Sequence, residues 1–194
     1  MRSLPWKVLV LVAALLFAAN VFIWRAALAP RALTVRVFET GKGRAILATT
    51  PSGKTLLIDS GSDASILRAL GSALPPWRRT LDVVIPIKAG AGLAEVKNRY
   101  RITKTLSTIT RGTRITLDRS TFIDVLWPAP NVPDAPVLLL SYGATSFLIE
   151  PVTTPHIEKY LTSADADLPP SDAVIASNTP GEVLVSDGVS VRTN

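Results

Sequence analysis

The chain of 194 residues contains no cysteine. It therefore cannot form disulfide bonds, bind zinc through thiolates or use a cysteine nucleophile. Histidine occurs once, at His156, and this limits both metal binding and acid–base chemistry, which rely heavily on imidazole groups. Charged residues are also sparse, at 19%, whereas hydrophobic residues reach 47%, so the chain is able to bury a core.

The short motifs typical of nucleotide binding and covalent catalysis are missing as well. The chain has no P-loop and no glycine-rich dinucleotide pattern. Ser60, which stands between Asp59 and Gly61, lacks a nucleophile-elbow pattern and has no identifiable histidine partner. His156 follows Pro155 and is interpreted as an exposed residue at the start of a helix. We predict no catalytic residue, no metal and no cofactor.

The formal net charge of +6 is unevenly distributed. Residues 1–31 carry four basic residues and no acidic one, so the high isoelectric point is largely a property of the N-terminal segment. Further along, residues 77–119 carry ten basic and three acidic residues, and residues 120–194 carry two basic and nine acidic ones. This pattern predicts a dipolar domain, whose basic part is able to meet phosphates or to serve simply as a solvated surface.

An uncharged apolar segment extends from Val8 to Trp24 between two basic residues. Its seventeen residues are near the lower limit for a helix that spans a bilayer, and tryptophans at both ends suit the membrane interface. A cleaved signal peptide is the alternative, because Ala27-Leu28-Ala29 has the small-x-small pattern of a cleavage site. Pro30 directly after that site favours an uncleaved anchor, so we expect a single-pass membrane protein with residues 1–31 as its anchor.

Residues 32–194 read as one domain in which strands alternate with a few helices. Alternating and apolar runs predict strands, a hairpin signal lies at 51–53, and helical spacing of leucine and isoleucine predicts a helix over 66–74. The expected strands are 33–38, 45–49, 54–59, 81–87, 113–117, 121–127, 137–142, 145–150, 182–185 and 189–192. Further helices are expected at 93–100 and 154–161, and residues 39–44 are expected to form a turn. The fold class is α/β, with layered sheets and flanking helices.

The segment 33–61 resembles the beginning of the C-terminal metallo-β-lactamase-like domain of ComEC, the DNA-uptake channel protein. It contains an opening strand, a glycine-containing turn, a second strand, a Pro-Ser-Gly hairpin and Leu57-Ile58-Asp59-Ser60-Gly61. The resemblance continues through Trp77 to Val84 and Gly92 to Val96, and it weakens after residue 150. It implies a shortened metallo-β-lactamase-like sandwich of β-sheets with flanking helices, preceded by a membrane helix and facing the outside of the cell.

The metal ligands of that family have no counterparts in this chain. Its histidine-rich loop corresponds to residues 86–92, where Lys88 would repel a metal ion, and its His-His-Gly-Ser motif has no match near residues 176–181. The opening turn carries Glu39, Lys42 and Arg44 where the family tends to have Asp, Gln and Asp. Asp59 and Glu150 are interpreted as remnants of the family site.

We therefore expect a non-catalytic, membrane-anchored domain that acts by binding, with DNA backbone as the predicted partner. The candidate phosphate contacts are Arg78, Arg79, Lys97, Arg99, Arg101 and Lys104. One alternative is an interaction module that docks on another membrane protein of an uptake system. The other is a hydrolase with an unorthodox magnesium site built from the carboxylates of Asp59, Asp63, Asp82 and Glu150.

Overall fold

The computed structural model describes residues 6–28, 32–41, 43–87, 91–127, 136–151, 159, 170–176 and 181–193. The chain divides into two compact units, residues 1–31 and 32–194, each of which is described by itself. The first unit contains helix α1 (Trp6–Leu28). Its segment Trp6–Trp24 is long and apolar enough to cross a membrane, with a mean hydropathy of 2.3.

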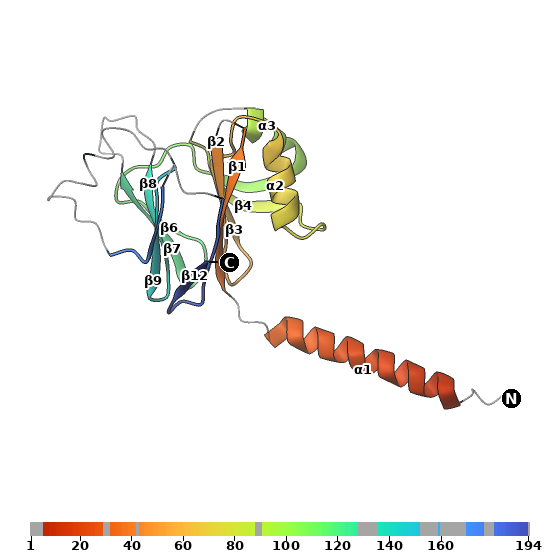
Figure 1. The fold of residues 1–194 in the computed structure, drawn as a ribbon. Coiled ribbons are helices and arrows are strands. Elements are labelled where there is room, and N and C mark those ends of the chain that lie inside the picture. Colours follow the sequence, from red (N-terminus) through yellow and green to blue (C-terminus); the bar gives the residue numbers. More distant parts are fainter. Residues whose placement is uncertain are drawn as a thin grey trace. The chain divides into compact units, whose positions relative to one another are not determined.

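The second unit is built on two β-sheets that lie face to face (Figure 1). The larger sheet has seven strands in the spatial order β12 (Val191–Thr193), β11 (Val183–Ser186), β1 (Leu33–Thr40), β2 (Gly43–Thr49), β3 (Thr55–Ile58), β4 (Thr80–Ile85) and β5 (Arg101–Thr105). The smaller sheet has the order β10 (Ala173–Ile175), β9 (Thr145–Ile149), β8 (Val137–Tyr142), β7 (Thr121–Trp127) and β6 (Arg114–Thr116).

Strand alternation determines which side chains enter the core between the sheets. In β1, Leu33, Val35 and Val37 are buried, and the residues between them are partly exposed. Phe147 of β9 is fully buried in the same cluster, which also contains Ile123 of β7. The inner faces of both sheets therefore form one apolar layer between them.

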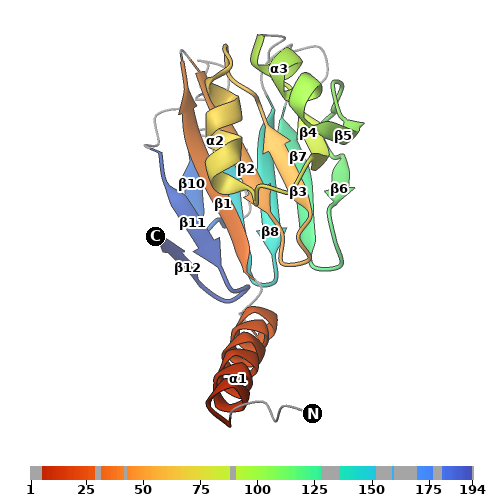
Figure 2. The same cartoon turned by 90° about the vertical axis from the view of Figure 1, so that its right-hand side faces the viewer.

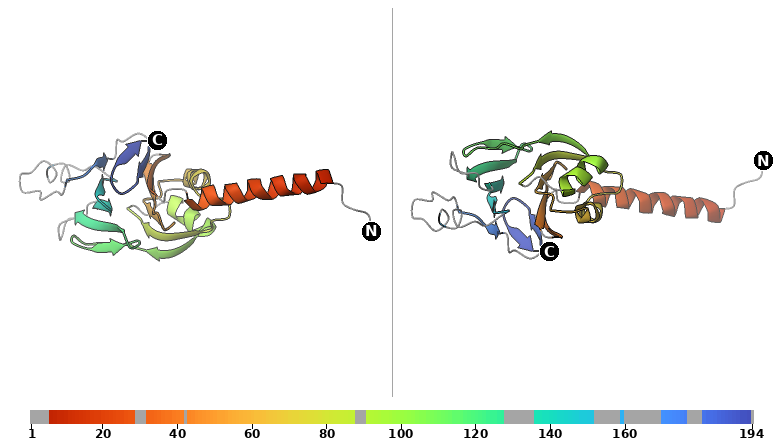
Figure 3. Two further views of the ribbon diagram at one scale, coloured as in Figure 1. Left: turned by 90° about the horizontal axis from the view of Figure 1, so that it is seen from below. Right: turned by 90° about the horizontal axis from the view of Figure 1, so that it is seen from above.

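Helices α2 (Ser65–Ala73) and α3 (Ala91–Arg99) lie against the outer face of the seven-stranded sheet (Figure 2). Ile66 and Leu70 of α2 and Val96 of α3 are fully buried in a second apolar cluster on that face. The end-on views show the resulting layers of the second unit, with α2 and α3 on one side of the two sheets (Figure 3). The prediction of a layered α/β domain is confirmed.

Several element boundaries differ from the predictions. The predicted turn over 39–44 is wrong in extent, because β1 continues to Thr40, β2 begins at Gly43 and Glu39 pairs with Arg44. Strands β5 and β10 were not predicted: β5 is polar and mostly exposed, and β10 has only three residues. The expected helix over 154–161 lies outside the described residues except for Lys159.

Asp59 and Asp63 form the connection between β3 and α2. Asp59 ends the strand with a positive φ of 57°, a conformation that aspartate tolerates better than most residues. Asp63 is not the N-cap residue of α2, since Ala64 holds that position. Its carboxylate nevertheless accepts the backbone N–H of Ser65 at 2.9 Å, so it satisfies a donor of the first helical turn.

Candidate functional site

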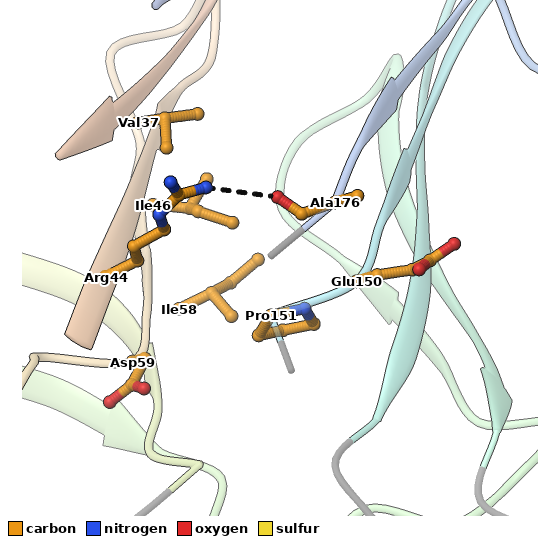
Figure 4. A pocket seen from close by; sticks show the side chains of 8 residues that line it. All are labelled: Val37, Arg44, Ile46, Ile58, Asp59, Glu150, Pro151 and Ala176. Carbon is orange, nitrogen blue, oxygen red and sulfur yellow. Dashed lines mark hydrogen bonds between the residues drawn. The ribbon is translucent and has the colours of Figure 1, made fainter. Parts of the chain in front are cut away.

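A small hollow lies between the two sheets, at the end where β3 and β9 finish (Figure 4). Its lining is mostly apolar. The residues that line it are Val37, Arg44, Ile46, Ile58, Asp59, Glu150, Pro151 and Ala176. The two predicted remnant positions, Asp59 and Glu150, therefore border the same hollow from opposite sheets.

The carboxylate of Asp59 is engaged by its own loop. Oδ1 accepts the backbone N–H of Ser60 at 2.6 Å and that of Gly61 at 3.3 Å. The backbone N–H of Asp59 donates to the carbonyl of Ile85 at 2.9 Å, which ties the turn to β4. These contacts give Asp59 a structural role in the turn that leaves β3.

Glu150 points away from the hollow, although its backbone borders it (Figure 4). Successive side chains of a strand alternate between the two faces, and Ile149 faces the core between the sheets. Glu150 therefore falls on the outer face, the side of Leu148, where only 6% of it is exposed. Burial raises the pKa of the Glu150 carboxyl. The structure thus does not bring the carboxylates of Asp59 and Glu150 together.

Arg44 brings a positive charge to the lining of the hollow from β2. Its Nη1 donates to the carbonyl of Ala176 at 3.4 Å, so the side chain reaches from β2 toward the end of β10 (Figure 4). Its Nη2 lies 3.9 Å from Oε1 of Glu39, whose side chain is 70% exposed, so this ion pair is weak. The signal for Arg44 was present in the sequence, because it stands where the similar family tends to have an aspartate.

The described residues that line the hollow do not fit a resident metal ion. A dinuclear hydrolytic site needs several converging histidines and carboxylates, and in the described part of the chain no three such residues are grouped to hold a cation. The permanent charge of Arg44 would repel a divalent cation in the hollow. The magnesium site considered from Asp59, Asp63, Asp82 and Glu150 is wrong, since these four described carboxylates do not converge. His156, Lys88 and residues 177–180 lie outside the described residues.

Five of the six predicted phosphate contacts lie along one edge of the seven-stranded sheet. Lys97 and Arg99 lie at the C-terminal end of α3, Arg101 and Lys104 lie on the edge strand β5, and Arg79 precedes β4. All five are exposed, and no ion pair within the described ranges involves any of them. The backbone N–H of Arg101 donates to the carbonyl of Arg79 at 2.8 Å, which joins the beginnings of β4 and β5.

Arg78 differs from these five residues because its guanidinium group is bound within the domain. Its Nη2 lies 2.9 Å from Oδ2 of Asp82, and its Nε donates to the carbonyl of Thr80 at 3.2 Å. Asp82 also accepts Lys54 Nζ at 2.9 Å. We use the name basic edge for Arg79, Lys97, Arg99, Arg101 and Lys104, without Arg78.

Solved structures share this architecture at low sequence identity. A variant of the metallo-β-lactamase from Cronobacter sakazakii with a mutated HARLDQ motif has a TM-score of 0.52 and 15% identity, covering 74% of this chain and 76% of that chain. The MIM-2 metallo-β-lactamase has a TM-score of 0.51 and 15% identity, covering 74% of this chain and 72% of that chain. No family model matches the sequence, and no curated protein matches it. The chain therefore contains a domain with the metallo-β-lactamase fold.

Proposed function

We propose that this chain is a membrane-anchored, non-catalytic domain of the metallo-β-lactamase fold that binds the backbone of DNA along its basic edge. The observation that carries the proposal is the basic edge itself, five exposed cations on neighbouring elements with no carboxylate partner in the described ranges. The sequence resemblance to the ComEC domain supports DNA as the polyanion and a DNA-uptake system as the context.

The anchor is supported by the composition and exposure of α1. Large apolar side chains on this helix, such as Leu16, Phe17 and Phe22, are 67%, 72% and 75% exposed. Apolar surface of this extent is stable when lipid covers it. We place the domain on the extracytoplasmic side, as the resemblance implies. A mass measurement of the purified protein checks the anchor, because a signal peptide cut after Ala29 would remove the helix.

The absence of catalysis is supported by the hollow between the sheets. Arg44 brings a fixed positive charge, Asp59 is engaged by backbone amides, and Glu150 faces the other side of its sheet. Hydrolysis assays with DNA and phosphodiester substrates in the presence of Zn²⁺, Mn²⁺ or Mg²⁺ test this part. Metal-dependent turnover that disappears on replacing a residue of the hollow would contradict it.

The binding proposal is tested with the full chain in nanodiscs of neutral lipid and a fluorescent DNA duplex. Each lysine or arginine that contacts a phosphate contributes about 0.9 to the slope of log affinity against log salt. A variant with Lys97, Arg99, Arg101 and Lys104 replaced by glutamine should therefore bind more weakly and show a shallower salt slope. Arg68→Gln is the matched control, since Arg68 is an exposed cation on α2 away from the basic edge. Equal binding by the wild type and the four-residue variant at low salt would refute DNA binding by this edge.

A second candidate function is docking on another membrane protein. It is favoured by the position of β5 at the edge of its sheet, where the strand pairs with β4 and with no other described strand. An exposed strand edge can accept a strand from a partner, and the cations of β5 would select an acidic one. Chemical crosslinking from Lys104 in native membranes, with Arg68→Lys as a control position, separates this function from DNA binding.

A further inference from the structure

The chain enters the sandwich at Leu33, and several loops lie at the same end of the strands. Leu33 pairs with Ser186, so the turn between β11 and β12 lies beside the entry point. Thr34 pairs with Thr49, which places the hairpin between β2 and β3 there as well. Ser52 of that hairpin donates to Asp118 at 2.8 Å, which brings in the loop between β6 and β7. We call this surface, formed by residues 50–54, 75–79, 117–120 and 187–190, the entry end.

The entry end exposes two large apolar side chains. Trp77 is 82% exposed and Val189 is 81% exposed, whereas Val174, the other exposed large hydrophobic residue in the described part of the domain, is 52% exposed. The loop of Trp77 is well supported, because the N–H of Arg78 donates to the carbonyl of Pro75 at 2.9 Å. Arg78 in turn binds Asp82. Trp77 is thus presented on a structured turn instead of being buried, which is unusual for a side chain of this size.

The two apolar side chains lie on either side of the entry point. Val189 follows β11, the neighbour of β1, and Trp77 precedes β4, which is three strands away from β1 in the other direction. With a spacing of about 4.8 Å between strands, β11 and β4 are about 19 Å apart. Leu33 lies between these strands, so the two exposed apolar side chains and the residue at which the chain enters the domain share one broad face.

Positive charge accompanies the apolar groups. Arg79 and Arg119 are exposed at the entry end, and no ion pair involves either residue in the part of the chain that the structure describes. The acidic groups of the entry end are Asp118, which accepts from Ser52, and the exposed Asp187, which accepts the backbone N–H groups of Val189 and Ser190 at 2.9 Å and 2.8 Å. Asp82, next to this end, binds Lys54 and Arg78. The two free arginines are therefore able to meet an anionic surface.

The connection to the apolar helix limits how far this face can be from the bilayer. Eight residues, 25–32, separate Trp24 from Leu33. A fully extended chain of that length would span about 30 Å, and the connection is shorter because its first four residues continue helix α1. A tryptophan beside arginines is the composition favoured at a lipid interface, where the ring inserts among headgroups and the cations meet lipid phosphates.

We propose that the entry end docks on the surface of an anionic bilayer, with Trp77 and Val189 in the interfacial layer and Arg79 and Arg119 against lipid phosphates. The inference rests on the membrane anchor of the proposed function. It assigns the domain a fixed orientation on the lipid, in which one end of the strands faces the bilayer and the hollow at the opposite end faces away from it.

The test uses the full chain, whose lack of cysteine allows a single labelling site. Thr80→Cys places an environment-sensitive fluorophore on an exposed residue next to Arg79 and leaves Trp77 in place. Ala91→Cys is the control, because Ala91 is exposed at the start of α3, near the opposite end of the strands. Both proteins are placed in nanodiscs of phosphatidylcholine alone and in nanodiscs that also contain phosphatidylglycerol. Iodide in solution and nitroxide-labelled lipids quench the fluorophore from the two sides.

Docking predicts that, in anionic nanodiscs, the label at position 80 is protected from iodide and quenched by the labelled lipid, whereas the label at position 91 is not. Trp77→Ser with Val189→Ser, and separately Arg79→Gln with Arg119→Gln, should each restore access by iodide at position 80. Equal access at positions 80 and 91 in anionic nanodiscs, with an unchanged circular dichroism spectrum, would overturn the docking proposal. Protection at position 80 by a DNA duplex and not by anionic lipid would also overturn it. A chain that does not enter nanodiscs at all overturns the anchor instead, so the two failures are distinguishable.

Discussion

Replacing Asp82 by alanine is expected to destabilise the domain by about 2–4 kcal/mol. One carboxylate here joins three parts of the chain. Oδ1 accepts Lys54 Nζ at 2.9 Å, and Oδ2 accepts Arg78 Nη2 at 2.9 Å and both the N–H and the hydroxyl of Thr55 at 3.0 Å. Asp82 thereby connects the β2–β3 hairpin, the beginning of β4 and the loop that presents Trp77.

The magnitude follows from the burial of the donors. Thr55 is fully buried, so removal of its acceptor leaves a buried N–H without a partner, at a cost of about 1–3 kcal/mol. The ion pair with Lys54 contributes less, about 0.2–1 kcal/mol, because 53% of the Lys54 side chain is exposed. Asp82→Asn keeps an acceptor for Thr55 and should therefore lose only about half of the total.

The pH dependence of the effect provides an independent check. Burial disfavours the ionised form of Asp82, but the hydrogen bonds from Lys54 and Thr55 outweigh it and lower its pKa below 3.8. A lowered pKa means that the stabilisation is present above the unfolded-state value and disappears as the pH falls through the folded-state value. The difference in stability between wild type and Asp82→Asn should therefore shrink on acidification below pH 3.8.

Urea denaturation of the full chain in a nonionic detergent, followed by circular dichroism, measures these differences in the free energy of unfolding. Asp124→Ala is the matched control, since Asp124 binds Arg114 at 2.7 Å and 2.9 Å but the Arg114 side chain is 65% exposed. That pair should contribute less than about 1 kcal/mol. A loss at Asp82 no larger than the loss at Asp124 would refute the reasoning from burial.

Two further predictions concern the contact between α3 and the loop after β3, and the outer face of the smaller sheet. Gly92→Ala should destabilise the domain, because a Cβ on Gly92 would lie 2.2 Å from the carbonyl oxygen of Ser60. Gly71→Ala in α2 is the control, because a Cβ there meets open space and should stabilise the domain by about 1 kcal/mol. Thermal denaturation compares the two variants, and equal effects on stability would contradict the predicted close approach at Gly92. Glu150→Gln should stabilise the domain at neutral pH and lose this advantage as the pH falls through the raised pKa of Glu150 toward its ordinary value of 4.5, because protonation of the buried carboxylate removes the cost of burying its charge. An unchanged unfolding curve for Glu150→Gln would remove the inferred cost of burying that carboxylate.

Much of the fold followed from local patterns. The alternation in 33–38 and the apolar run in 81–87 correctly predicted β1 and β4, and the spacing of Ile66 and Leu70 correctly predicted α2. Strand β5 was not predicted because most of its residues are exposed at the edge of the sheet, so its sequence shows no alternation of apolar and polar residues. Its existence depends on pairing with β4, which lies on the far side of α3 in the sequence.

The site was less predictable than the fold. Asp59 and Glu150 were chosen as remnants by resemblance, and they do border one hollow, but the orientation of Glu150 depends on the register of β9 with β8. The basic edge was predicted as a set of residues, and Arg78 left that set because Asp82 lies within reach of its guanidinium. Neither the orientation of Glu150 nor the ion pair between Arg78 and Asp82 follows from composition or periodicity along the chain.

The sequence by itself determined the chemistry that is excluded and the kind of fold. A chain with no cysteine and one histidine lacks the usual ligands for zinc, and a continuous apolar segment before an alternating domain indicates a helix that precedes a sandwich. Only the tertiary structure decided that Arg44 reaches the carbonyl of Ala176, 132 residues away, and that Glu150 faces the outer side of its sheet. The physical reason is that a side chain's face and its neighbours are set by strand pairing between distant segments, whereas composition and periodicity are properties of each segment alone.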